Sequence, residues 1–242
     1  MKYIETFNEN NEHGIIEWIS MKLGRNIGKR IGDGLFSVVY EFGDMRAIRF
    51  SDVLKKEYIE LENKTIPHIV RIYQNGSIKV PKKFIQRTPS GYFFKLGWNT
   101  YHSDTLYYTI MERVYRSFKF VDAMDMIDIT IGYYIEEHED YNDITKFGYL
   151  YDECNSHDVI QWIYDSLQGD LDPYKFKYVS HIFADLVVLM RSLSKKFEWR
   201  DIHSAQFGQR KNGELVAFDI DGIEINDSYE LKNIIKEKGP LD

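Results

Sequence analysis

The hydrophobic positions near the start of the chain follow a helical spacing and then change to the pattern of strands. Residues 13–23 carry an apolar residue every three or four positions, which predicts a short amphipathic helix. Residues 27–50 are rich in β-branched and aromatic residues interrupted by glycines, which predicts strands, and Gly43-Asp44 is typical of a hairpin tip. The apolar positions of the helix are Ile15, Ile16, Ile19 and Leu23.

A single helix and three further strands are predicted for the rest of the first half. Ser51 is a candidate helix N-cap, and the spacing of Leu54, Tyr58 and Leu61 predicts a helix over about 52–63 that Pro67 ends. The strands are predicted over about 68–79, 91–97 and 105–112.

The second half changes character to mostly helix over residues 115–198. Asp172-Pro173 is an N-cap followed by proline at the first helical position, and it predicts a long helix whose apolar face runs to Phe197. This change near residue 114 predicts two lobes, residues 1–113 and residues 114–242, and an α+β fold class with a β-rich first lobe.

Two turn signals follow the long helix. Asn212-Gly213 predicts a hairpin between two short strands. Asp227, with Glu230 three positions later, forms a capping-box pattern that predicts a last helix to about Lys238.

Bulk composition excludes several classes of protein. The 242 residues fit one domain or two small lobes, and a net charge of −7 argues against a general nucleic-acid binder. A single cysteine, Cys154, excludes an internal disulfide and fits a reducing compartment. No apolar run reaches the roughly 18 residues of a membrane span, and the first residues lack the apolar core of a signal peptide, so a cytoplasmic location is expected.

Two candidate phosphate-binding features lie among the first strands. Gly32 and Gly34, followed by Ser37 and Val39, would let backbone N–H groups approach a phosphate, although a structural turn explains two glycines equally well. The strand Ala47-Ile48-Arg49 ends in a cation that could hold phosphates or could be an ordinary surface arginine.

Two acidic segments follow the long helix. Asp201 lies on a loop with Gln206 five residues later, which can combine a catalytic base with a metal ligand or can be an ordinary polar loop after a helix. Asp219, between the apolar Phe218 and Ile220, would face a cleft, although the segment could also be a polar turn, and for Asp221 the two interpretations are about equal.

The order and spacing of these features resemble the protein-kinase fold over about residues 27–222, with a poor match at 115–175. Trp199-Arg200-Asp201 stands where His-Arg-Asp is expected, and Asp219-Ile220-Asp221 stands where Asp-Phe-Gly is expected. Asp201-Ile202-His203 is similar to the Asp-x-His pattern of aminoglycoside phosphotransferases, and Asp-Ile-His-Ser resembles the catalytic loop of early protein kinases of lytic bacteriophages.

The resemblance implies roles for particular residues around Mg-ATP bound between two lobes. Asp201 would be the base, with His203 beside it, and Gln206, Asp219 and Asp221 would face Mg²⁺. The nucleotide would contact the glycine segment (Gly32, Gly34, Ser37, Val39), the strand with Ala47 and Arg49, the ion-pair glutamate Glu57, the gatekeeper Met111 and the hinge from Glu112 to Val114.

Several departures from the kinase pattern leave two functions open. Arg49 replaces lysine, Gln206 replaces asparagine, and only 23 residues follow Asp219, too few for the peptide-binding helices of ordinary protein kinases. The leading hypothesis is a phosphotransferase acting on Ser/Thr of a protein, in the host cytoplasm if the chain is viral. The alternative is a pseudokinase that binds or inhibits a partner protein, and a small-molecule kinase is a third option.

The acidic residues between 136 and 153 also allow two interpretations. They form either a solvated face or a docking surface for a basic substrate, and the neighbouring His138 and His157 have no zinc-ligand spacing. These residues are Glu136, Glu137, Glu139, Asp140, Asp152 and Glu153.

Overall fold

The computed structural model describes residues 2–34, 37–88, 91–138, 145–199, 202–220 and 223–225. The chain divides into two compact units, of which the first comprises residues 1–66 and 70–113 and the second comprises residues 67–69 and 114–242. The first unit is built mainly from strands and the second mainly from helices, so the predicted α+β class is confirmed. Within the described residues, no helix is long and apolar enough to cross a membrane.

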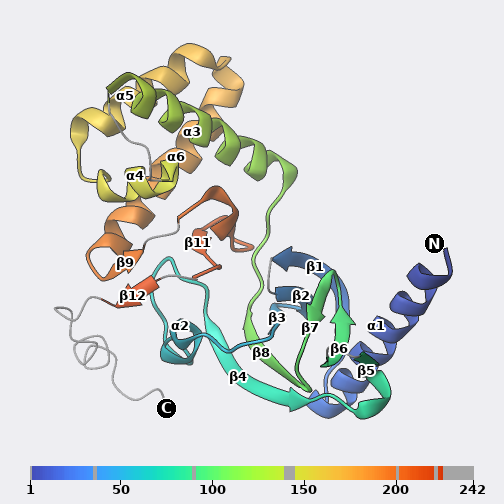
Figure 1. Ribbon diagram of the computed structural model, residues 1–242. Coiled ribbons are helices and arrows are strands. Elements are labelled where there is room, and N and C mark those ends of the chain that lie inside the picture. Colours follow the sequence, from blue (N-terminus) through green and yellow to red (C-terminus); the bar gives the residue numbers. More distant parts are fainter. Residues whose placement is uncertain are drawn as a thin grey trace. The chain divides into compact units, whose positions relative to one another are not determined.

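A five-stranded antiparallel sheet forms the centre of the first unit, with strand order β1-β2-β3-β8-β4 (Figure 1). Gly43 joins β2 to β3 with a φ of 69°, so the predicted hairpin tip is confirmed. The strands are β1 (Ile27–Gly34), β2 (Ser37–Phe42), β3 (Arg46–Ser51), β4 (Ile72–Lys79) and β8 (Thr105–Glu112).

One face of this sheet packs against the N-terminal helix and a smaller antiparallel sheet. Helix α1 (Lys2–Leu23) continues the predicted helix toward the N-terminus, and Ile15 and Ile19 are fully buried against the sheet. The smaller sheet consists of β5 (Gln86–Thr88), β6 (Gly91–Leu96) and β7 (Asn99–Tyr101), preceded by the 3₁₀ turn η1 (Lys82–Phe84). The shared core includes Val38, Tyr40, Ile48, Phe50, Phe94, Leu96, Tyr101 and Ile110.

The helix predicted over 52–63 is wrong in its extent, because α2 spans only Lys56–Glu60. Ser51 is the last residue of β3, and its hydroxyl donates to the carbonyl of Val53 (2.6 Å) instead of capping a helix. Asn63 has a φ of 58°, so the chain leaves helical geometry well before Pro67.

The strand predicted over 68–79 also begins later than expected, at Ile72. His68 has a φ of 64°, and Ile69 forms an isolated parallel bridge with Ala217 of the second unit's hairpin. The carbonyls of these two residues accept hydrogen bonds from Ala217 N (2.8 Å) and Arg210 Nη2 (3.1 Å). Their backbone groups therefore pair within the second unit rather than with β8.

Helices α3 to α6 form the body of the second unit, and strands gather after them (Figure 1). Asp172 accepts from the backbone N of Tyr174 (3.0 Å) and of Lys175 (3.1 Å), with Pro173 at the first helical position, so the predicted cap is confirmed. The helices are α3 (Phe118–His138), α4 (Lys146–Asp152), α5 (His157–Asp170) and α6 (Pro173–Ser194).

The long helix α6 ends at Ser194, so the prediction that it continues to Phe197 is wrong. Phe197 begins β9 (Phe197–Trp199), which pairs antiparallel with β12 (Ile223–Ile225). Between them lie η2 (Ser204–Gln206), β10 (Phe207–Gln209) and β11 (Leu215–Ala217). Gly213 lies at the turn between β10 and β11 with a φ of 89°, which confirms that predicted hairpin, whereas the predicted last helix from Asp227 lies outside the described residues.

Candidate active site

Four predicted nucleotide-binding residues lie on one face of the five-stranded sheet. Val39 is paired with Arg49, and Arg49 with Thr109, across β2, β3 and β8. Two residues along, Ala47 is paired with Met111. Because side chains two apart on a strand point to the same face, these two rows share the face opposite the core formed with α1. Ala47 and Met111 are buried on that face.

The glycine segment forms the hairpin between β1 and β2. Gly32 is paired with Val39 and Gly34 with Ser37, while residues 35 and 36 lie outside the described residues. A Cβ added at Gly34 would lie 3.0 Å from the Ser37 hydroxyl oxygen, whereas one at Gly32 would meet only an ordinary contact at 3.9 Å. A side chain would therefore be less easily accommodated at Gly34 than at Gly32.

Arg49 of β3 contacts Tyr58 of α2. Its guanidinium lies 4.7 Å from the centre of the Tyr58 ring and donates a hydrogen bond to the Tyr58 hydroxyl. Glu57, the predicted partner of Arg49, is the half-buried residue before Tyr58 on the same helix. The sequence identified Tyr58 only as an apolar helix position, so its contact with Arg49 was missed.

A polar network that the sequence did not indicate joins α2 to the sheet. The Thr109 hydroxyl donates to Asn75 Oδ1 (2.7 Å), and Asn75 Nδ2 donates to the carbonyl of Tyr58 (2.8 Å) and to Glu62 Oε2 (2.9 Å). Thr109 is buried, so its hydroxyl depends on this partner. Asn75 on β4 thereby holds the segment that carries Tyr58 against the strands that carry Arg49 and Thr109.

A small pocket opens beside Arg49 at the end of β3. Its lining includes two cationic residues, Arg49 and Lys55, and one acidic residue, Asp52. The lining residues are Arg49, Ser51, Asp52, Val53, Leu54, Lys55, Tyr58 and Thr109.

The predicted hinge follows the end of β8, and its residues form hydrogen bonds and an ion pair with neighbouring segments. Glu112 donates its N–H to the carbonyl of Arg71 (2.8 Å), and its carboxylate accepts from Arg71 N (3.3 Å). Arg113 forms an ion pair with Glu41 (2.9 Å). Val114 is the first residue after the boundary between the units.

The predicted catalytic loop lies between β9 and β10. Asp201 and Arg200 are outside the described residues, but the next residue, Ile202, is fully buried. The Thr145 hydroxyl donates to the carbonyl of Ile202 (2.6 Å) and accepts from Gly148 N (3.0 Å) as the N-cap of α4. A capped helix terminus therefore anchors the residue that follows Asp201.

Gln206 and the residues around Asp219 are brought together by the β10–β11 hairpin. Phe218 N donates to the carbonyl of Gln206 (2.9 Å), and Gln206 Oε1 accepts from His203 N (3.0 Å). Gln206 is 1% exposed, Asp219 is half-buried and His203 is exposed. Asp221 lies outside the described residues.

Strand pairs close both ends of the two segments that carry the predicted aspartates. Phe207 pairs with Ala217 at one end, and Trp199 pairs with Ile223 at the other. Of the two segments between these pairs, the structure describes residues 202–206 and residues 218–220. The hydrogen bond from Phe218 N to the carbonyl of Gln206 joins these described parts.

Aromatic side chains pack around the strands β9 and β10. Trp199, which stands where the kinase pattern has histidine, packs at 6.2 Å from Tyr151 and 5.7 Å from Phe207 between ring centres. The Tyr151 hydroxyl donates to the carbonyl of Phe197 (2.8 Å), and burial raises the pKa of Tyr151. A neutral, buried tyrosine thus fixes the start of β9.

The remaining electrostatic features lie close to the same loop. Arg116 Nη2 lies 3.4 Å from the carbonyl of Ser204, and burial lowers the pKa of Arg116. Among the residues that the structure describes, no group of three or more His, Cys, Asp or Glu side chains gathers as a metal site. Only Asp219 and Gln206 of the predicted metal ligands lie in that part of the chain.

Comparison with known proteins finds similarity among solved structures. No protein-family model matches the chain, and no curated protein matches its sequence. It is similar to the aminoglycoside phosphotransferase APH(2")-IIa in its streptomycin–ATP complex, with 15% identity over 88% of this chain and 72% of that one and a TM-score of 0.29. It is also similar to the spectinomycin phosphotransferase APH(9)-Ia bound to ADP and spectinomycin, with 13% identity over 95% and 80% and a TM-score of 0.33.

A third similar structure is ADP-bound APH(2'')-Ib, with 15% identity over 88% of this chain and 72% of that one and a TM-score of 0.28. Aminoglycoside phosphotransferases, which the catalytic loop resembles in sequence, are therefore among the solved structures to which the chain is similar.

Proposed function

We propose that this chain is a Mg-ATP-dependent phosphotransferase. The observation that carries the proposal is the hydrogen bond from Phe218 N to the carbonyl of Gln206, which joins the residue before Asp219 to the loop that follows Asp201 in the sequence. Asp201 as a base and Asp219 as a metal ligand would then act on one phosphoryl group. The shared sheet face of Val39, Ala47, Arg49 and Met111 supports the nucleotide part of the proposal.

The roles follow from the chemistry of each side chain. Asp201 orients the acceptor hydroxyl and takes its proton as the phosphoryl group leaves ATP. Arg49, held by Tyr58, binds a phosphate, and backbone N–H groups of the glycine hairpin bind the others. Met111 and the segment to Val114 contact the adenine.

The oxygen donors around Asp219 fit Mg²⁺, which prefers carboxylate and carbonyl oxygens. Asp219 supplies a half-buried carboxylate, and Gln206 supplies an amide oxygen, which accepts from His203 N (3.0 Å). Asp221 is a further candidate ligand. When bound, Mg²⁺ neutralises the charge that develops on the transferred phosphoryl group.

We infer that the acceptor is a serine or threonine hydroxyl of a protein, as the likeness of Asp201-Ile202-His203-Ser204 to phage protein kinases suggests. His203 also supports a small-molecule acceptor, since it is exposed on the same loop. The two acceptors differ in the product that they give, a labelled protein or a labelled metabolite.

One observation favours a second function, a pseudokinase that binds a partner protein. Gln206 Oε1 already accepts from His203 N, and Arg49 is engaged by the hydroxyl of Tyr58. If neither group leaves these contacts, the fold would bind nucleotide or protein without transferring phosphate.

Incubation with γ-labelled ATP and Mg²⁺ separates these functions. A phosphotransferase labels itself, a generic protein substrate or a small-molecule acceptor, and Asp201→Asn abolishes the label. A thermal shift with ATP and no transfer to any acceptor would instead identify the binding module. Absence of both the shift and the transfer would refute nucleotide chemistry altogether.

A further inference from the structure

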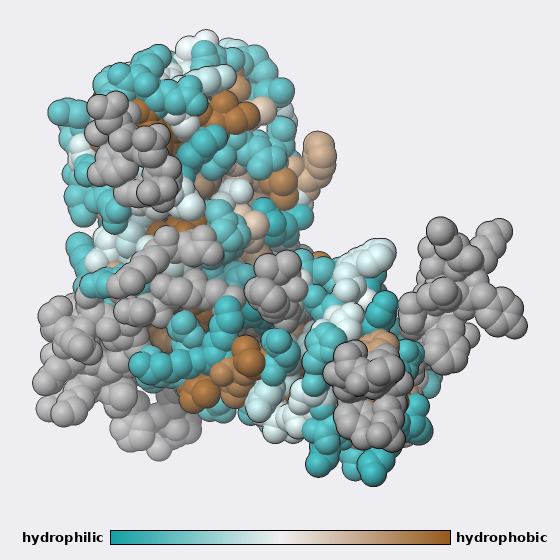
Figure 2. All heavy atoms as spheres, in the orientation of Figure 1, coloured by the Kyte–Doolittle hydropathy of each residue, from teal (hydrophilic) through white to brown (hydrophobic). Residues whose placement is uncertain are grey.

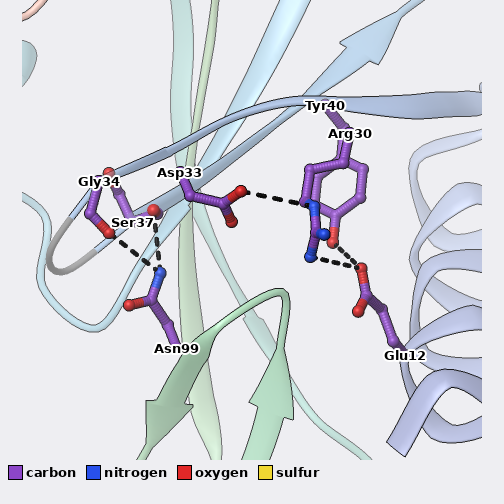
Figure 3. Close-up of polar contacts among 7 residues, drawn as sticks. All are labelled: Glu12, Arg30, Asp33, Gly34, Ser37, Tyr40 and Asn99. Carbon is purple, nitrogen blue, oxygen red and sulfur yellow. Dashed lines mark hydrogen bonds and ion pairs between the residues drawn. The ribbon is translucent and has the colours of Figure 1, made fainter. Parts of the chain in front are cut away.

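The glycine hairpin is held by an asparagine from a separate sheet. Asn99, the first residue of β7, donates its side-chain amide to the carbonyl of Ser37 (2.9 Å) and to the carbonyl of Gly34 (3.4 Å). These two residues are paired across the hairpin on β2 and β1. Figure 3 shows the Asn99 amide pointing at both strands from the β6–β7 turn.

The β6–β7 turn is fitted closely to the same hairpin. Gly97 has a φ of 61°, and a Cβ at this position would lie 2.8 Å from Asp33 Oδ1 and 2.9 Å from Val38 Cγ2. Glycine is therefore required at Gly97 both by its backbone conformation and by the lack of space. Val38 belongs to the core face of the sheet, so the turn approaches the hairpin from that side.

A second set of contacts links the base of the hairpin to α1. Arg30 lies 3.5 Å from the carboxylate of Asp33 and 3.8 Å from that of Glu12, which also accepts from the Tyr40 hydroxyl (2.6 Å). Figure 3 shows Arg30 between the two carboxylates. The hairpin is thus restrained at its base by charged groups and near its tip by Asn99.

We propose that Asn99 is a positioning residue for phosphate binding by the glycine hairpin, an inference that rests on the proposed function. A hairpin binds phosphate through backbone N–H groups, and its carbonyl oxygens repel the anion. Asn99 binds the carbonyls of Gly34 and Ser37 from the smaller sheet, which packs on the core face, opposite the face that carries Ala47 and Arg49. Carbonyl oxygens that accept from Asn99 are not free to face a bound phosphate, and the hairpin is ordered before the nucleotide binds.

The test compares Asn99→Ala and Asn99→Leu with the control Thr100→Ala, which changes the next, exposed residue of β7. Asn99→Leu keeps a side chain of similar size but has no donor. Amide hydrogen exchange of the nucleotide-free protein is measured on peptides covering residues 30–40. Binding of Mg-ATP and of adenosine is measured separately by calorimetry on the same proteins.

Both Asn99 variants are expected to exchange faster over residues 30–40, and the control is expected to match the wild type. Each variant should bind Mg-ATP about fivefold to thirtyfold more weakly, which corresponds to the loss of one or two hydrogen bonds, and should bind adenosine as well as the wild type does. General destabilisation would weaken both ligands equally, so the difference between ATP and adenosine identifies positioning.

Unchanged exchange, or equal loss of ATP and adenosine affinity, would overturn the positioning role. If the wild type binds no ATP, the proposed function fails instead. The exchange measurement then still tests the role of Asn99. Faster exchange in the variants would support the restraint of the hairpin by Asn99, and unchanged exchange would refute it.

Discussion

Replacing Asn75 with alanine should loosen the attachment of α2 to the sheet. The substitution removes the acceptor of the buried Thr109 hydroxyl, one donor to the carbonyl of Tyr58 and one donor to Glu62. Each lost neutral hydrogen bond costs about 1 kcal/mol, and a buried group left without a partner costs about 1–3 kcal/mol. The lost hydrogen bond to Glu62 costs less free energy, because this carboxylate is only half-buried and still accepts from the backbone N of residue 75 (3.2 Å).

The expected sum for Asn75→Ala is a decrease of about 2–3 kcal/mol in the free energy of unfolding, or a Tm lower by about 5–10 °C for a chain of this size. Urea denaturation followed by far-UV circular dichroism measures this change, with Ser77→Ala on the exposed part of the same strand as the control. A double-mutant cycle with Thr109→Val should give a coupling energy of about 1 kcal/mol. If Asn75→Ala differs from Ser77→Ala by less than about 0.5 kcal/mol, the network does not hold α2.

Three further changes test other parts of the molecule. Tyr58→Phe keeps the ring beside Arg49 but removes the hydroxyl that accepts from it, so Mg-ATP should bind about threefold to tenfold more weakly in calorimetry, and unchanged affinity would show that Arg49 needs no such partner. Burial raises the pKa of Tyr101, so this side chain stays neutral in the folded state and the free energy of unfolding should fall as pH rises above about 10. Urea titrations between pH 8 and 11 should show a smaller fall for Tyr101→Phe than for the wild type. An equal fall in the two proteins would contradict this prediction. Asp172→Ala removes the cap of α6 and should cost about 1 kcal/mol in thermal unfolding, whereas Asp172→Ser should restore most of it.

Local signals in the sequence predicted those parts of the fold that depend on a few neighbouring residues. Gly43 and Asn212-Gly213 marked hairpin turns because a positive φ favours glycine, and Asp172-Pro173 marked the start of α6 because both residues act within one helical turn. The predicted length of α2 was too great, because the spacing of apolar residues is the same in a helix of one turn and in a helix of three turns. The predicted α6 also extended into residues that form β9.

The contacts that define the candidate site come from residues far apart in the sequence. Asn75 and Thr109 are 34 residues apart, and Asn99 lies more than 60 residues from Gly34 and Ser37. No local pattern specifies such pairs, because they depend on strand register and on which face of a sheet a hairpin covers. The contact between Arg49 and Tyr58 was also missed, because the sequence identified Tyr58 only as an apolar position of a helix.

The surface offers few further clues to a partner. On the face drawn in Figure 2, hydrophilic side chains surround separate hydrophobic patches. Large exposed apolar side chains such as Val53, Ile59 and Phe118 are dispersed over different elements. Single exposed hydrophobic residues are common on soluble domains, so they indicate no partner by themselves.

A crystal structure of the chain with a non-hydrolysable ATP analogue and Mg²⁺ tests the proposed function most directly. The account predicts one Mg²⁺ bound by Asp219 at about 2.1 Å, with the Asp201 carboxylate near the same terminal phosphate and the adenine on the face of Ala47 and Met111. Carboxylates of Asp201 and Asp219 on separate surfaces, with the analogue bound to neither, would contradict it.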